Sequence, residues 1–111
     1  MQIQEQKKGA VTVLRPVGPL TQDDAEQFKT RLMAVRDQSM GRFVVDAGAV
    51  PYVDSRGLEV LVEANDEVTR AGQSLKLCAI NETLREVLDL TELSSLFEHY
   101  EDANSAVRSF L

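Results

Sequence analysis

Short apolar runs recur along the chain at the lengths typical of β-strands. Residues 11–14, Val-Thr-Val-Leu, alternate in polarity and are rich in β-branched side chains. Residues 42–46 and 75–80 read as two further buried strands, and residues 95–98 as a last one. These runs predict a sheet with four core strands.

The N-terminal segment predicts one more strand at the edge of this sheet. Residues 3–6 are expected to pair with residues 11–14 through a turn at residues 7–10, which contains a glycine. Pro16 and Pro19 follow the first core strand, and we expect them to end it, because proline donates no hydrogen bond to a ladder.

Helical spacing of apolar residues predicts a helix between each pair of core strands. The first helix begins with Thr21 as its cap, carries Asp23 and Asp24 in its first turn, and stops at Gly41. Its inner face is formed by Ala25, Phe28, Leu32 and Val35.

The second helix begins at Asp54, which reads as the N-cap, with Ser55 as the first helical residue. Gly72 ends it. Asn81 and Asp102 are expected to cap two shorter helices. The inward stripe of the second helix is predicted to contain Leu58, Leu61, Val62, Asn65 and Val68.

Strands that alternate with helices indicate an α/β fold. We predict a single domain over residues 1–111, with a mostly parallel sheet of four to five strands, an antiparallel N-terminal edge and about four helices. Sites in such sheets gather beyond the carboxyl ends of the strands. The loop at residues 47–54 occupies such a place.

Composition and charge exclude some classes of binding partner. The chain has a formal net charge of −6, which argues against nucleic acid and anionic membranes as partners, because both bind basic patches. Residues 81–111 hold seven acids and two bases, which fits either a solvated face or an acidic docking surface. The N-terminus lacks the apolar run of a signal peptide, and no stretch approaches the roughly 20 apolar residues of a membrane span. A cytoplasmic protein is expected.

Few residues offer catalytic or metal chemistry. His99 is the only histidine and Cys78 the only cysteine, too few for a metal site of the usual nitrogen and sulfur type. Cys78 lies in an apolar strand and reads as a core residue. No glycine-rich phosphate loop occurs, and nothing in the spacing joins His99 to Ser55 as a triad. We predict no enzyme activity, no metal and no cofactor.

The segment Asp54-Ser55-Arg56-Gly57 supports two interpretations. One is a plain helix cap, with Gly57 present for close packing. The other is a modification site, in which the Ser55 hydroxyl points outward at the positive end of a helix, where a phosphate is favoured. Arg56 would partly neutralise such a phosphate.

Residues 44–60, which read VVDAGAVPYVDSRGLEV, resemble the signature of the STAS domain family and, more narrowly, of bacterial anti-sigma factor antagonists. The family pattern is an apolar strand ending in Asp, a short loop, an aromatic or aliphatic pair, and then Asp-Ser-x-Gly-Leu. The positions that match are Asp46, Tyr52, Val53, Asp54, Ser55, Gly57 and Leu58. Further similarity covers Gly18-x-Leu20, the segment from Ala71 to Cys78, and Val87-x-x-Leu90-Thr91-x-Leu93 with Phe97.

This resemblance implies a switch that works through Ser55. In the family, the matching serine is phosphorylated by a kinase of the histidine-kinase-like ATPase type, which is also the anti-sigma factor. The unphosphorylated antagonist binds that kinase, and a PP2C-type phosphatase restores the hydroxyl. The partner-binding residues expected on this basis are Tyr52, Asp54, Arg56, Gly57, Glu59, Thr21, Asp23 and Asp24.

Two positions depart from the family pattern. Thr21 stands where the family often has an acid, so Asp23 or Asp24 would have to replace it, and Arg56 stands where a small residue is usual. Two other functions remain open for a STAS domain: a subunit of an ABC-type lipid transport complex, and a nucleotide-binding sensor. The absence of a glycine-rich loop speaks against the second.

Overall fold

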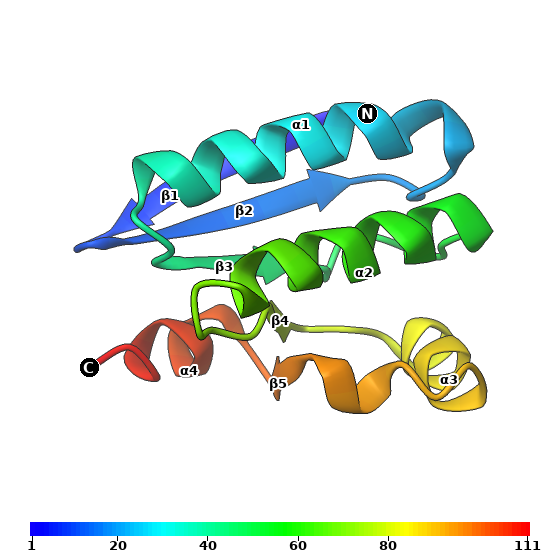
Figure 1. Cartoon of the computed structure of the whole chain (residues 1–111). Helices are drawn as coiled ribbons and strands as arrows, with labels where there is room; N and C mark the ends of the chain where they lie inside the picture. Colours follow the sequence, from blue (N-terminus) through cyan, green and yellow to red (C-terminus); the bar gives the residue numbers. More distant parts are fainter.

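The sheet has five strands whose spatial order follows the chain. The structure, a computed structural model, describes residues 1–111. The first two strands pair antiparallel and every later pair is parallel, which confirms the predicted sheet (Figure 1). The strands are β1 (Gln2–Lys8), β2 (Val11–Val17), β3 (Phe43–Asp46), β4 (Lys76–Cys78) and β5 (Glu98–Tyr100).

Helices cover both faces of this sheet. The helices are α1 (Gln22–Gln38), α2 (Ser55–Thr69), α3 (Glu82–Leu90) and α4 (Ala103–Arg108). The main core joins α1, α2 and α3 to one face, whereas α4 packs on the other through Ala106, which lies against Val44 and Cys78. Neighbours along β3 show the division, because Val45 belongs to the first core and Val44 to the second.

The buried residues are apolar apart from Thr12 and Asn65. Phe28 and Leu32 of α1 are completely buried, as the helical spacing predicts. Asn65 of α2 is also buried, and its Oδ1 accepts a hydrogen bond from the backbone N–H of Leu75 at 2.9 Å. The amide oxygen therefore ties α2 to the chain that enters β4 and is itself paired.

Pro16 does not end β2, contrary to the prediction. The strand continues to Val17, and Pro16 pairs with Ile3 of β1. Thr12 and Gly18 both donate their N–H groups toward the β3 side, to Arg42 and Ala49. Alternation places the Pro16 nitrogen on that same side, beyond the last β2–β3 pair, so its missing N–H removes no bond to β1.

The last strand begins later than predicted. Residues 94–96 form a 3₁₀ turn (Ser94–Leu96), and β5 starts at Glu98, whose N–H donates to the carbonyl of Leu75. β5 has only β4 to pair with, and β4 spans three residues. The strand therefore begins where its neighbour first offers a partner.

Candidate functional site

Ser55 lies at the end of the molecule where the parallel strands finish. It is the first residue of α2 and is exposed to solvent. The preceding loop is fixed to the segment after β2, because Leu20 donates its N–H to the carbonyl of Tyr52 and pairs in parallel with Val53. The start of α2, where Ser55 is the first residue, thus lies on an anchored corner next to the start of α1 (Figure 1).

Asp54 caps both helices that meet at this corner. Its Oδ1 accepts from the N–H of Gly57 at 2.8 Å, and its Oδ2 accepts from the N–H of Gln22, the first residue of α1, at 2.9 Å. The bond from Gly57, followed by that from Gln22, lowers the pKa of the Asp54 carboxyl. Thr21 occupies the N-cap position of α1, as predicted, but its side chain makes no capping bond.

Gly57 is a packing residue. It is buried, and a Cβ at this position would lie 2.2 Å from the carbonyl oxygen of Leu20. Only glycine allows α2 to approach the segment before α1 this closely. Gly57 positions Ser55 rather than presenting a side chain to a partner.

Arg56 is occupied by carboxylates from two helices. Its guanidinium donates to Glu26 of α1, to Glu59 at 3.0 Å and to Glu63 at 2.7 Å. Glu63 also accepts from Lys29 of α1 at 2.9 Å. The hydrogen bond with Glu26, then that with Glu63, raises the pKa of Arg56. These bonds hold the Arg56 side chain between α1 and α2. The expectation that Arg56 neutralises a phosphate on Ser55 therefore finds no support.

The remaining predicted partner residues surround the same corner. The Tyr52 side chain is 51% exposed, and Asp23 and Glu59 are exposed. Asp24 is half-buried and forms an ion pair with the N-terminal ammonium at 3.2 Å. Because Asp54 bonds Gln22, the first turn of α1 lies beside the start of α2, and the predicted set shares one end of the molecule.

Sequence reasoning missed an apolar groove next to Ser55. Leu58 and Val62 were predicted to point inward, but both are only half-buried. With Leu93 they line a groove of about 340 Å³ that is bordered by Glu59 and Glu63. The signal was present in the spacing, since Leu58 and Val62 follow Ser55 by three and seven residues and so share its face of the helix.

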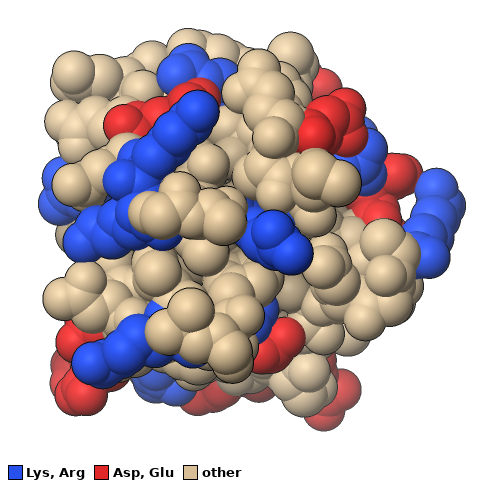
Figure 2. Space-filling model, turned by 90° about the vertical axis from the view of Figure 1, so that its left-hand side faces the viewer, with Lys and Arg blue, Asp and Glu red and all other residues tan.

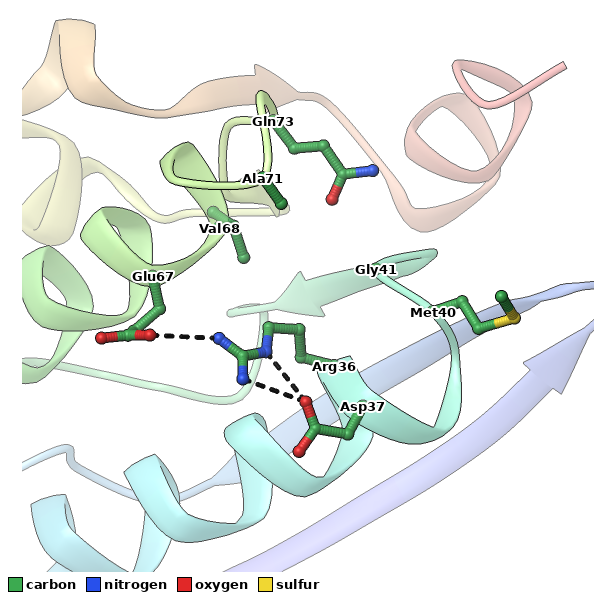
Figure 3. A pocket seen from close by; sticks show the side chains of 8 residues that line it. All are labelled: Arg36, Asp37, Met40, Gly41, Glu67, Val68, Ala71 and Gln73. Carbon is green, nitrogen blue, oxygen red and sulfur yellow. Dashed lines mark hydrogen bonds and ion pairs between the residues drawn. The ribbon is translucent and has the colours of Figure 1, made fainter.

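The opposite end of the molecule differs in charge and in shape. Figure 2 shows this end, where Lys and Arg side chains are spread over a mostly uncharged surface and the acids lie mainly toward its edges. Figure 3 shows a pocket of about 510 Å³ between the C-terminal ends of α1 and α2. There Arg36 is bonded to Asp37 and Glu67.

Cys78 and His99 do not contribute to this corner. Cys78 is fully buried, and burial, with a smaller effect of Asp46 and Asp102, raises the pKa of its thiol to about 12. The Nε2 of His99 lies 2.6 Å from the carbonyl oxygen of Ser94, to which it donates. Since His99 pairs with Leu77, the neighbour of Cys78, the two side chains point to opposite faces of the sheet.

Comparison with known proteins identifies the fold family. The profile of the STAS domain matches residues 2–106. The chain belongs to the STAS family. This STAS domain is 28% identical over 93 residues to BtrV of Bordetella bronchiseptica, a proposed anti-sigma factor antagonist. The matched region covers 84% of this chain and 80% of BtrV.

Solved structures share the fold of this STAS domain at low sequence identity. A proposed anti-sigma factor antagonist from Thermotoga maritima superposes with a TM-score of 0.87 at 22% identity, covering 96% of this chain and 92% of that one. The phosphorylated form of SpoIIAA, a cell fate determinant of Bacillus, superposes with a TM-score of 0.72 at 17% identity, covering 99% and 100%. No helix of this chain combines the length and the apolar character needed to span a membrane.

Proposed function

We propose that this STAS domain is an anti-sigma factor antagonist switched by phosphorylation of Ser55. The unphosphorylated form binds a serine kinase of the histidine-kinase-like ATPase type that is also the anti-sigma factor, and the phosphorylated form releases it. A PP2C-type phosphatase restores the hydroxyl. The observation that carries the proposal is the exposed Ser55 hydroxyl on the first residue of α2, inside an Asp-Ser-x-Gly-Leu motif.

The corner supports release by charge rather than by a change of shape. A phosphate adds about −1.5 to −2 charges, which the N-terminus of α2 tolerates. In a packed interface the same charge loses its hydration and repels facing acids. A loss of a few kcal/mol of binding free energy corresponds to roughly a hundredfold weaker complex. Arg56 does not relieve this penalty, because three carboxylates already hold it.

The chain acts in this scheme as a substrate and a binding partner in the cytoplasm, not as an enzyme. Its titratable groups at the corner serve structure: Asp54 accepts bonds from two backbone N–H groups, and Arg56 is held by carboxylates. The kinase supplies ATP and catalysis, and this domain supplies the acceptor hydroxyl. Neither a cofactor nor a metal enters the proposal.

Phosphate transfer to Ser55 tests the proposal directly. The purified chain is incubated with ATP and the candidate kinase, and the modified residue is mapped by mass spectrometry. We expect one phosphate on Ser55, its loss in Ser55→Ala, and its retention in Ser95→Ala, which changes another exposed serine. In a binding assay with the same kinase, Ser55→Asp should weaken the complex about a hundredfold and Ser55→Ala should preserve it.

Two results would contradict this function. An unmodified Ser55 combined with stable co-purification with a transporter ATPase would favour a transport subunit instead. Equal binding of the kinase by Ser55→Ala and Ser55→Asp would show that charge at this position does not control the complex.

A further inference from the structure

An apolar groove continues from Ser55 along the same face of α2. Leu58 and Val62 form one wall and Leu93, from the segment after α3, forms the other. Ser55, Leu58 and Val62 are separated by three and four residues, so the groove begins about one helical turn from the hydroxyl. Any protein that covers Ser55 therefore has this groove within its reach.

The charges around the groove favour a basic occupant. Arg56 pairs with both Glu59 and Glu63, and Lys29 of α1 also pairs with Glu63, so the charges at the edge nearest Ser55 largely cancel. Beyond them, exposed acids outnumber exposed bases, and the one base on α3 is Arg85, one turn before Asp89. The side chains of Asp66, Asp89 and Glu92 are exposed and form no ion pair; Asp66 lies one turn beyond Val62, and Glu92 adjoins Leu93.

We propose that the groove receives an amphipathic helix of the partner kinase, an inference that rests on the proposed function of Ser55. The helix inserts one or two large apolar side chains between Val62 and Leu93 and places Lys or Arg against Asp66 and Glu92. Apolar anchors at helical spacing in a groove are a common mode of protein recognition. The groove thus adds a docking contact to the phosphorylation corner.

The corner at Ser55 and the groove make separate contributions to the kinase reaction. A phosphate on Ser55 acts at the end of the groove and leaves its apolar walls unchanged. Docking holds the substrate before and during transfer but does not touch the reacting oxygen. Loss of docking should therefore raise KM and leave kcat nearly unchanged.

Charge and packing variants test the groove with the kinase that phosphorylates Ser55. Val62→Thr, which preserves shape, and Val62→Asp are each expected to raise the dissociation constant of the unphosphorylated complex, the second by tenfold or more. Met40→Asp is the matched control, because Met40 is 84% exposed in the loop after α1, at the other end of the molecule. Urea unfolding of each variant establishes that it folds.

The acidic edge is tested separately by substitutions that leave the core untouched. Asp66→Lys with Glu92→Lys should weaken binding several-fold and reduce its dependence on salt. Glu101→Lys is the control, since Glu101 is exposed, unpaired and on the turn before α4. Unchanged binding in both the Val62 and the acidic variants would overturn the proposal.

Cross-linking identifies the occupant. Val62→Cys carries the only accessible thiol, because Cys78 is buried and its pKa is raised to about 12. A benzophenone attached there should cross-link to a kinase peptide with apolar residues at helical spacing and flanking Lys or Arg. Cross-links to an acidic peptide, or between two copies of this chain, would overturn the assignment. If the groove variants bind the kinase normally and Ser55→Asp does not, the groove proposal is refuted and the proposed function of Ser55 stands. Phosphorylation at a residue other than Ser55 would refute the proposed function itself.

Discussion

The backbone N–H of Gln22 donates a hydrogen bond of 2.9 Å to Oδ2 of Asp54, across 32 positions of sequence. The other oxygen of the same carboxylate accepts from Gly57. One side chain therefore satisfies orphan N–H groups at the starts of α1 and α2 and holds the two helix ends together. This bond, rather than a local cap, sets the first turn of α1 beside Ser55.

Removal of the Asp54 carboxylate, which caps both α1 and α2, should destabilise the fold more than removal of the Thr21 hydroxyl, the cap that the sequence predicts for α1. Asp54→Ala deletes both bonds and leaves two helix starts uncapped, so we expect a clearly lower urea midpoint. Thr21→Ala should stay within about 0.5 kcal/mol of the parent in its free energy of unfolding, because Thr21 makes no capping bond. Equal losses in the two variants would show that the capping of α1 is local.

Acid should destabilise the chain by protonating three carboxylates whose pKa is lowered in the fold. The pKa values of Asp54 and Asp102 are lowered chiefly by backbone bonds from Gly57 and Ser105, and that of Glu63 chiefly by its bond from Lys29. Carboxyls with lowered pKa bind fewer protons in the folded than in the unfolded chain. Their stabilising effect is therefore complete above the ordinary carboxyl pKa of about 4 and is lost as pH falls through the lower folded values.

Urea unfolding between pH 7 and pH 3 measures this effect. We expect a nearly constant midpoint down to about pH 5 and a steady decline below it. Asp54→Asn should reduce the steepness of the decline, because one of the shifted carboxyls is removed. A midpoint that rises on acidification would contradict the direction of these shifts.

The sequence predicted those features that depend on residues close in the chain. The start of α2 at Ser55 follows from a cap and a glycine three residues apart, and the buried stripe of α1 follows from helical spacing. The cap of α1 could not be predicted, because its acceptor comes from Asp54, far along the chain. Val62 was misplaced because spacing gives the centre of a helix face but not its margin, which here depends on where Leu93 packs.

Gly57 should be the least replaceable residue of the corner. In Gly57→Ala, the new methyl group would lie 2.2 Å from the carbonyl oxygen of Leu20, so the backbone must move. Such overpacking costs about 1–3 kcal/mol, which outweighs the gain of about 1 kcal/mol in helix propensity. We expect a lower free energy of unfolding in urea, and a larger loss in Gly57→Val. A more stable Gly57→Ala would show that propensity dominates and that the contact yields easily.

A negative charge at Ser55 should leave the fold intact, as release by charge alone requires. In Ser55→Asp the carboxylate lies at the positive end of α2, which stabilises the helix by about 0.3–1 kcal/mol, while the nearby Asp54 carboxylate opposes part of this gain. We therefore expect a free energy of unfolding within about 1 kcal/mol of the parent.

Backbone NMR separates release by charge from release by rearrangement. Amide shifts in Ser55→Asp and in the phosphorylated chain should change only near the start of α2 and in the adjoining first turn of α1, which Asp54 links to it. Ser95→Asp, at an exposed position outside the corner, provides the control. Shifts that extend through β3 or α4 would mean that the phosphate acts by altering the fold, and the electrostatic account of release would then be wrong.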